Sequence, residues 1–291
     1  MKKVVTGSML ALMLVFTLAG GAAAITNGQP DGDAHPYVGL LVFDAEFCNE
    51  QGEECQVLPA WSCSGSLIAP TVVLTAGHCT DGAVAVRAWF EEKLQAEDGS
   101  LLVDDFPFGG GDSTEGTAYT YPEYNNDPNR KGNGLPSFAY RDVGIVVLDE
   151  PVDVGGFAAL PEPGQVDELS NKSPVEFVGY GVQFQAQIPG NQLPQPPPFY
   201  RWDGFYNRYY ATGELISGNF VHAREFIRVS FNPGGGSGGI CFGDSGGPIL
   251  QSGTNIVLGV NSYVANINCA GTGYASRVDV PEVLPWIESF L

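Results

Sequence analysis

The segment GGICFGDSGGPIL, residues 238–250, surrounds a single serine with glycines. Three glycines flank the Asp244–Ser245 pair, and a cysteine stands four residues before the serine. Such a stretch is either a turn at the surface or a loop in which the serine is a nucleophile and backbone amides are left free for an anion. The rest of the chain decides between these two interpretations.

The composition predicts one all-β domain. The chain has 291 residues with 39 glycines and 21 prolines, which is typical of many turns between short strands. Charged residues make up 16% of it, which disfavours long exposed helices. All-β domains of such length often fold as a single unit. Runs typical of strands recur at residues 37–43, 65–77, 83–90, 143–152, 174–181, 225–231 and 255–264.

Two stretches lack such strand-like runs and are predicted to be surface loops. Residues 91–135 are rich in Asp, Glu, Gly, Asn and Tyr, and residues 183–200 contain a proline cluster, for which a polyproline docking motif is the less favoured alternative. One amphipathic helix is expected, at the C-terminus. There Val283, Ile287 and Leu291 are spaced by four residues, with Asp279 as a candidate N-terminal cap.

The N-terminus is predicted to be a secretory signal peptide spanning residues 1–24. Two lysines are followed by the apolar run MLALMLVFTL at 9–18 and by AGGAAA, small residues that end at Ala24. This apolar run is too short for a membrane-spanning helix, which needs about 20 residues. We therefore expect a secreted, extracellular protein whose mature domain covers residues 25–291, with no membrane association.

The acidic net charge of the chain argues against nucleic acid as a partner. The net charge is −20, and loss of the two N-terminal lysines leaves 11 of 13 basic residues against 33 acidic ones, or −22. Binding to nucleic acid needs a basic face, which this balance does not favour.

Six cysteines in an exported chain predict three disulfides, and the count alone allows 15 pairings. The alternative, a zinc site, is disfavoured because the sequence contains no Cys-x-x-Cys pair and only three histidines. The cysteines are Cys48, Cys55, Cys63, Cys79, Cys241 and Cys269.

A nucleophilic serine needs a base and a group that orients the base. TAGHC at 75–79, RDVGIVVL at 141–148 and GDSGGP at 243–248 supply a histidine, an aspartate and a serine in that order. These three segments resemble the signature segments of the trypsin/chymotrypsin-like serine proteases, and the resemblance covers nearly all of the chain from residue 25 onward. It implies two packed six-stranded antiparallel Greek-key barrels with a short C-terminal helix and an active site between the barrels.

The resemblance implies a role for each matching residue. Ser245 would attack the scissile carbonyl, His78 would accept and return the proton, and Asp142 would orient His78. The amides of Gly243 and Ser245 would form the oxyanion hole. Ser262 matches the serine that supports the aspartate, and it is also assigned to the specificity pocket. The implied disulfides pair Cys63 with Cys79, Cys241 with Cys269 and Cys48 with Cys55.

The same resemblance indicates the specificity and the activation of the enzyme. The pocket floor would be Gly239, which has no charge for Lys or Arg, and the walls would be Val264 and a residue near Thr272 or Gly273. Cleavage after small or medium apolar residues is expected, with large apolar residues as the alternative. A freed Ile25 ammonium would pair with Asp244, and removal of the signal peptide, or trimming of a short remnant, would expose it.

The remaining expectations concern cofactors and a second class of function. We expect a monomer that acts on proteins or peptides without a cofactor. A calcium loop at Glu91, Glu92, Glu97 and Asp98 is the less favoured alternative to a solvated acidic loop. The alternative to an enzyme is an inactive protease-fold adhesin or binding protein, which a Ser245→Ala variant would distinguish.

Overall fold

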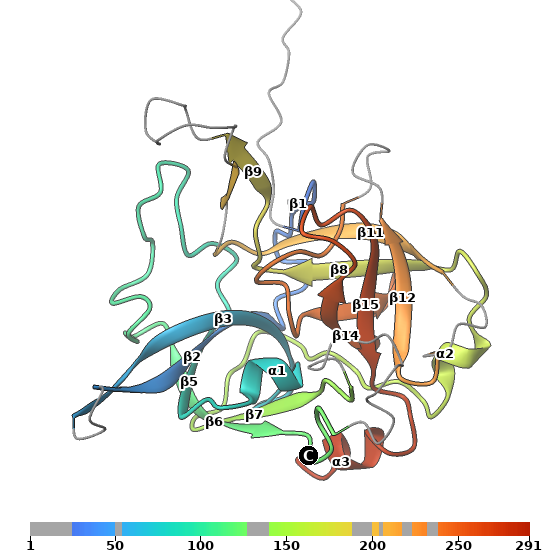
Figure 1. The fold of residues 1–291 in the computed structure, drawn as a ribbon, viewed down its shortest axis with the longest axis horizontal. Helices are drawn as coiled ribbons and strands as arrows, with labels where there is room; N and C mark the ends of the chain where they lie inside the picture. The colour runs from blue at the N-terminus through green and yellow to red at the C-terminus, as the bar shows by residue number, and fades with distance from the viewer. Residues whose placement is uncertain are drawn as a thin grey trace, which may run out of the picture.

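The computed structural model of the chain describes residues 25–49, 54–126, 140–187, 200–203, 206–216, 223–231 and 238–291. The predicted signal peptide and most of the predicted 183–200 loop lie outside these residues. The described chain forms two closed antiparallel β-barrels that lie side by side (Figure 1). Among the described residues, no helix is both long enough and apolar enough to cross a membrane.

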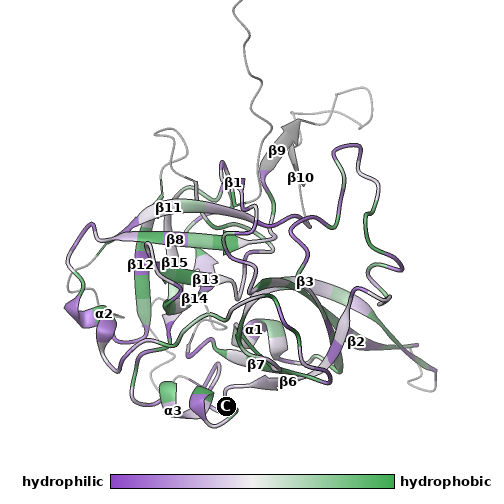
Figure 2. Cartoon of the chain, turned by 180° about the vertical axis from the view of Figure 1, so that it is seen from behind, coloured by the Kyte–Doolittle hydropathy of each residue, from purple (hydrophilic) through white to green (hydrophobic). Residues whose placement is uncertain are grey.

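The first barrel is built from the N-terminal half of the chain. Its strands are ordered β2-β3-β4-β7-β6-β5, and β5 pairs back with β2 to close it. The bounds are β2 Val38–Cys48, β3 Cys55–Ala69, β4 Val72–Thr75, β5 Ala85–Trp89, β6 Thr114–Thr120 and β7 Gly144–Leu148. Leucine, valine and isoleucine side chains from these strands fill its interior, as expected for β-branched and apolar residues on a pleated surface. Figure 2 marks hydrophobic residues along strands of both barrels.

The second barrel follows the same plan. Its six strands are ordered β11-β12-β15-β14-β13-β8, and pairing of β8 with β11 closes the ring. The bounds are β8 Pro174–Gly179, β11 Tyr209–Leu215, β12 Phe226–Phe231, β13 Pro248–Gln251, β14 Val257–Val264 and β15 Gly271–Arg277. The short strand β1 (Gln29–Pro30) adds to β11, and β9 (Phe184–Gln187) pairs with β10 (Tyr200–Asp203) outside the barrel.

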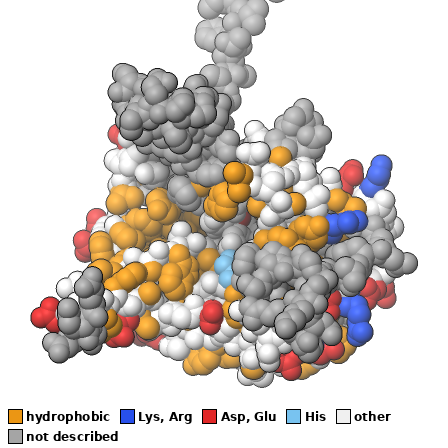
Figure 3. Space-filling view, in the orientation of Figure 1, with side chains coloured by type: hydrophobic (Ala, Val, Ile, Leu, Met, Phe, Trp, Pro, Cys, Tyr) orange, Lys and Arg blue, Asp and Glu red, His pale blue; other side chains and the backbone are white. Residues whose placement is uncertain are grey.

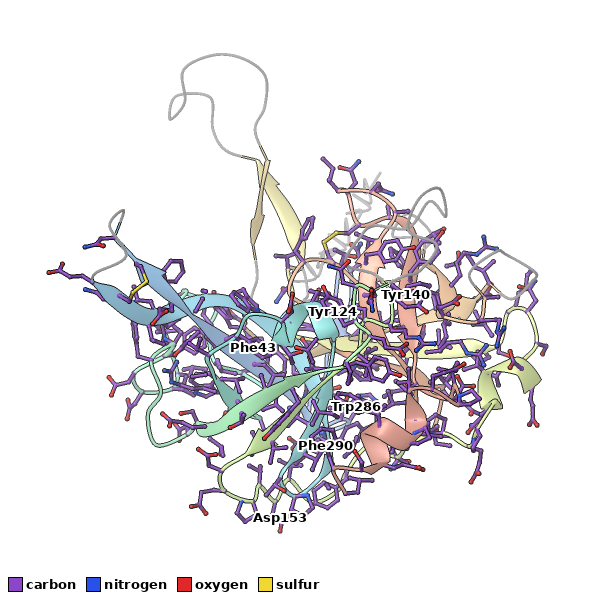
Figure 4. All side chains as sticks on the ribbon, turned by 60° about the horizontal axis from the view of Figure 1, so that its bottom comes forward. Phe43, Tyr124, Tyr140, Asp153, Trp286 and Phe290 are labelled. Atoms are coloured by element: carbon purple, nitrogen blue, oxygen red, sulfur yellow. A yellow bond between two sulfur atoms is a disulfide. The ribbon has the colours of Figure 1, made fainter. Side chains whose placement is uncertain are left out.

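The described residues also contain three short helices: α1 (Gly77–Thr80), α2 (Gln165–Glu168) and α3 (Leu284–Glu288). The C-terminal helix α3 follows the second barrel but packs on the first. Trp286 meets Tyr121 edge-on with ring centroids 5.2 Å apart, and Phe290 lies 5.2 Å from Tyr119 (Figure 4). The predicted cap is corrected: Asp279 accepts hydrogen bonds from Arg277 and the Val166 amide, and the helix begins five residues later.

The all-β fold with two six-stranded barrels is confirmed, but several elements differ from the sequence prediction, among them those within residues 65–77 and 91–135. The predicted run 65–77 contains the end of β3, a turn and all of β4, and β3 begins already at Cys55. The predicted loop 91–135 contains β6. This strand was missed because it is polar and includes Gly116, where a Cβ atom would lie 2.6 Å from the Val147 carbonyl oxygen.

The β2–β3 hairpin extends beyond the first barrel and carries exposed apolar side chains. Phe47, Val57 and Leu58 are 52%, 51% and 41% exposed, and a disulfide joins Cys48 to Cys55 at the end of the paired strands. Hydrophobic side chains gather on this face between the hairpin and the centre of the molecule (Figure 3).

A buried polar network joins the N-terminal segment to both barrels. The Arg208 guanidinium donates to Asp31 at 2.8 Å and to the carbonyl oxygens of Val38 and Phe90 at 3.1 and 2.9 Å. The Asp31 carboxylate also contacts His35 Nδ1 at 2.6 Å. Burial by itself raises the pKa of Asp31, but the hydrogen bonds from His35 and Arg208 outweigh it and hold the pKa below its usual value.

Candidate active site

His78 lies on α1, directly after β4 of the first barrel. Its backbone is fixed on two sides: the Cys63–Cys79 disulfide ties α1 to β3, and Gly77 packs against the Tyr124 ring (Figure 4). A Cβ atom at Gly77 would lie 2.8 Å from that ring and 3.1 Å from the Val143 nitrogen. The glycine of the TAGHC segment therefore allows the histidine to approach the residues that precede β7.

Asp142 lies two residues before β7 and is fully buried. Its Oδ1 accepts the His78 backbone N–H at 2.7 Å, and its Oδ2 lies 2.8 Å from His78 Nδ1. The Ser262 hydroxyl donates to the same Oδ2 at 2.6 Å. A carboxylate at Nδ1 keeps the proton on that nitrogen, so that Nε2 of the neutral ring is the basic atom.

Electrostatics at His78 favour the imidazolium form. Burial lowers the pKa of His78, but the charge of Asp142 and its hydrogen bond act in the opposite direction and leave the pKa raised above the usual 6.5. The pair can accept a proton on the imidazole and stabilise the resulting charge, as a general base requires.

Ser245 lies in a tight loop between the two barrels. Its carbonyl oxygen accepts from the Ser64 amide of β3 at 2.8 Å, and the Gly246 amide donates to the Asn261 carbonyl of β14 at 2.8 Å. Gly246 has a φ of +76°, and a Cβ atom there would lie 2.0 Å from Thr75 Oγ1. Only glycine fits this position, which explains why the segment that carries the serine is rich in glycine.

The amides of Gly243 and Ser245 face no acceptor within the part of the chain that the structure describes. Gly243 itself adopts a φ of +93°, a conformation that glycine tolerates and most residues avoid. Its carbonyl oxygen accepts the Ser64 hydroxyl at 3.0 Å, which fixes the peptide plane on the other side. Two neighbouring unpaired N–H groups beside a serine are suited to binding an oxyanion.

Asp244, between these two amides, is fully buried. Its carboxylate accepts from the Gly181 and Cys241 amides, each at 2.9 Å, and none of the described residues forms an ion pair with it. Burial raises the pKa of Asp244 to about 7, although the two amide hydrogen bonds lower it. A cation beside this buried carboxyl group would stabilise its charged form further.

The start of the described chain reaches the same loop. The Ile25 side chain is fully buried in the core of the second barrel. Thr26 forms an antiparallel bridge with Gly239: the Gly239 amide donates to the Thr26 carbonyl at 3.0 Å, and the Thr26 hydroxyl donates to the Gly239 carbonyl at 3.0 Å.

A cavity of about 470 Å³ opens beside the candidate serine. It is lined by His78, Ile240, Cys241, Phe242, Ser245, Asn261, Ser262, Tyr263 and Val264. The cavity therefore brings together the histidine, the serine and two of the predicted pocket residues, Ser262 and Val264. Its walls are mostly apolar, and none of the described residues that line it is acidic.

Two other predicted pocket residues do not line this cavity. A Cβ atom at Gly239 would lie 2.2 Å from the Phe231 ring, so Gly239 packs against β12. Thr272 pairs with Ser230 in the barrel wall. Ile240 takes the place next to the cavity, and its Cδ1 would lie 2.8 Å from a Cβ atom at Gly273.

The sequence interpretation missed Ile240, Phe242, Asn261 and Tyr263 as cavity residues. Ile240 and Phe242 lie within the glycine-rich segment itself, and Asn261 and Tyr263 directly precede and follow Ser262. Proximity in sequence to the matching residues was the signal that could have found all four. All six cysteines form the disulfides Cys48–Cys55, Cys63–Cys79 and Cys241–Cys269.

Potential metal ligands approach one another in two groups within the described residues. They are Cys63 with His78 and Cys79, and Glu46 with Cys48 and Cys55. The cysteines of both groups are already bonded to each other in disulfides, which removes the thiolates that a metal would bind. The acidic residues at 91–98 do not form such a group in the described structure.

Comparisons with known proteins identify the family and the fold. The family model described as Trypsin matches residues 43–287. Chymotrypsin-like elastase family member 3A of Homo sapiens is 28% identical over 218 residues, which are 72% of this chain and 70% of that protein. Proproteinase E of Bos taurus is 26% identical over 246 residues, covering 79% and 81% of the two chains.

Chymotrypsin-C of Rattus norvegicus is 26% identical over 220 residues, covering 72% of this chain and 69% of that protein. A solved structure of HL collagenase superposes with a TM-score of 0.60 at 19% identity, over 91% of this chain and 97% of that one. At this identity, the structural likeness establishes the shared fold.

Proposed function

The chain belongs to the trypsin family of serine proteases, and from this premise we propose that it is a secreted endopeptidase with His78, Asp142 and Ser245 as its catalytic residues. The observation that carries the proposal is the arrangement of His78. Its Nδ1 is held by a buried carboxylate, and its side chain lines the same cavity as the serine.

In the proposed reaction, Ser245 Oγ attacks the carbonyl carbon of the scissile peptide bond while His78 Nε2 removes the hydroxyl proton. The tetrahedral intermediate collapses as His78 returns this proton to the leaving amine, which gives an acyl-enzyme. Water then attacks the ester with His78 again as the base, and Ser245 is regenerated. Asp142 stabilises the His78 imidazolium during both formation and hydrolysis of the acyl-enzyme.

The unpaired amides of Gly243 and Ser245 would donate to the carbonyl oxygen as it becomes negative. Removing one donor of this kind typically costs about 3 kcal/mol of transition-state stabilisation. The Val182 amide donates to the Phe242 carbonyl oxygen at 2.8 Å, and because this carbonyl shares a peptide plane with the Gly243 N–H, the bond holds that donor in place before the substrate arrives.

We further propose cleavage after small or medium apolar residues. The cavity has apolar walls from Ile240 and Val264 and no acidic lining residue to pair with Lys or Arg. The elastase names of several relatives are consistent with this preference, and large apolar residues remain the alternative.

Activation would follow removal of residues 1–24, because the new Ile25 ammonium would then supply a cation to Asp244, with which none of the described residues forms an ion pair. The small residues that end at Ala24 are those expected before a signal-peptidase site. A signal peptide over residues 1–24 would also direct the protein to the extracellular space.

The test compares a chain that begins at Ile25 with its Ser245→Ala variant. We expect an organofluorophosphate probe to label Ser245 of the first form only, and a peptide library to be cleaved after small or medium apolar residues. An unlabelled, inactive but folded wild-type chain would contradict the catalytic proposal. A dominant preference for Lys or Arg would contradict the specificity alone.

A further inference from the structure

The backbone of Arg141 has an unusual conformation directly before the proposed catalytic residue Asp142. Its φ is +48°, in the left-handed region that residues other than glycine, asparagine and aspartate rarely adopt. Such a conformation costs strain energy, and it persists only where the surrounding contacts hold it. The strain lies one peptide bond away from the carboxylate that orients His78, so it bears on the geometry of the proposed catalytic residues.

Side chains on two sides hold the Arg141 guanidinium. Its Cζ lies 5.3 Å from the ring centroid of Tyr140 and 5.9 Å from that of Tyr121, both within the range of a cation–π contact. The guanidinium also forms an ion pair with Glu123, and the Arg141 side chain is 19% exposed. The Tyr121 ring is itself anchored, because its hydroxyl donates to the Glu282 carbonyl oxygen at 2.8 Å. These contacts fix the arginine and offset the strain of its backbone.

The left-handed residue leads into a tight turn of the chain, and Asp142 lies at the apex of this turn. The Val143 N–H donates to the Arg141 carbonyl oxygen at 2.9 Å, which closes a three-residue turn around Asp142. The preceding residue is held as well, since the Asn125 N–H donates to the Tyr140 carbonyl oxygen at 3.0 Å. The backbone angles of Arg141 therefore set the direction in which the Asp142 side chain leaves the backbone.

The Asp142 carboxylate depends on this direction because it serves two donors of His78 at once. Oδ1 accepts the His78 backbone N–H at 2.7 Å, and Oδ2 lies 2.8 Å from His78 Nδ1. The Ser262 hydroxyl donates to the same Oδ2 at 2.6 Å. Hydrogen bonds weaken steeply as their angles depart from linearity, so a turned carboxylate would lose at least one of the three.

We propose that Arg141 is a positioning residue, whose left-handed backbone, held by Tyr121, Glu123 and Tyr140, aims the Asp142 carboxylate at His78. This inference rests on the proposed function, since it concerns the orientation of a proposed catalytic residue. Arg141 does not line the cavity that contains Ser245, and it therefore acts through Asp142 alone.

The test compares Arg141→Ala with Arg141→Asn in chains that begin at Ile25. Both changes remove the charge and the contacts of the arginine. Asparagine adopts the left-handed conformation much more readily than alanine, so the pair isolates the backbone from the side chain. The pKa of His78 is measured by NMR titration in a Ser245→Ala background, and kcat/KM for an apolar peptide is measured with Ser245 intact.

We expect Arg141→Ala to lower both quantities. The kcat/KM should fall about ten- to hundred-fold, because small misplacements of catalytic groups have effects of this size. The pKa of His78 should fall toward 6.5, because the aligned Asp142 carboxylate is what raises it. Arg141→Asn should keep both values closer to those of the wild type.

The direction of the pKa change separates positioning from a simple charge effect. Loss of a nearby positive charge would by itself raise the pKa of His78, whereas loss of alignment lowers it. Lys172→Ala is the matched control. Lys172 is an exposed basic residue with a φ of +67° just before β8 of the second barrel, so its substitution makes the same demand on the backbone. It should leave the His78 pKa and kcat/KM unchanged.

Three results would overturn the role of Arg141. One is a His78 pKa in Arg141→Ala that equals or exceeds the wild-type value, whatever happens to kcat/KM. Another is an equal loss in Arg141→Ala and Arg141→Asn, which would show that the left-handed backbone is not the cause. The third is a loss of the same size in Lys172→Ala.

A further variant and a further measurement keep the proposal testable. If Arg141→Ala does not fold, Glu123→Gln takes its place, because it removes only the ion pair of a side chain that is 54% exposed. It should lower the His78 pKa by a smaller amount, and an unchanged pKa would overturn the proposal. Failure of the wild-type chain to cleave any peptide contradicts the proposed function instead, while the titration in the Ser245→Ala background still decides the role of Arg141.

Discussion

The buried carboxyl group of Asp244 should make the stability of the uncleaved chain depend on pH in an unusual direction. Burial raises the pKa of Asp244 from 3.8 to about 7, because only the Gly181 and Cys241 amides compensate for lost hydration. Between these two pH values the native protein keeps a proton that the unfolded chain releases. The free energy of unfolding should therefore fall as pH rises from about 4 to about 7.

The size of the effect follows from the difference in pKa. About three pKa units, at about 1.4 kcal/mol each, correspond to about 4 kcal/mol of stability lost by pH 7. Below pH 3.8 both states are protonated and the contribution of Asp244 is fully present. Above about pH 7 both states are ionised, and the loss is complete.

A chain that begins at Ile25 should behave differently. If its ammonium pairs with Asp244, the charged carboxylate is stabilised, its pKa falls, and the loss of stability toward pH 7 disappears. Removing one partner of such a buried pair typically costs about 3–5 kcal/mol, which is comparable to the effect expected in the uncleaved chain.

The assay is urea unfolding between pH 4 and 8, in a Ser245→Ala background that prevents self-digestion. The two forms are a chain that retains residues before Ile25 and a chain cut directly before it. Asp244→Asn in both forms serves as the reference, because it removes this titration and leaves the other acidic residues in place. The slope with pH that Asp244 adds to the uncleaved form should vanish in the cut form. Equal slopes in all four proteins would refute the reasoning.

Three further predictions follow from the hydrogen bonds. The kcat/KM of the active form should rise with pH as His78 loses its proton, with a midpoint above 6.5 because Asp142 raises the His78 pKa despite burial; a midpoint below 6.5 in a pH–rate profile would contradict this. Ser262→Ala should lower the free energy of unfolding by about 1.5–3 kcal/mol, measured in urea, because it removes a hydrogen bond to a buried charge. Arg208→Met should lower the free energy of unfolding by about 3–5 kcal/mol, because it leaves Asp31 buried without its cation. Adding Asp31→Asn should recover part of that loss. Full additivity of the two changes in free energy would argue against the ion pair.

The sequence could predict the two barrels and the candidate site because three short segments, and their order along the chain, carry the resemblance. No such segment marks the wall of the pocket, so the sequence could not locate it. Counting six positions before Ser245 reaches Gly239, but that residue turns toward the Phe231 ring of β12, a contact that depends on a strand whose pairing the sequence does not state. Ile240 therefore lies beside the cavity instead.

The Arg208–Asp31 pair shows a second limit. The two residues are 177 positions apart, and neither belongs to a segment with a recognisable pattern. Their contact exists because the N-terminal segment crosses from one barrel to the other and Arg208, just before β11, meets it there. Long-range polar contacts of this kind follow from tertiary packing, for which local propensity and spacing give no signal.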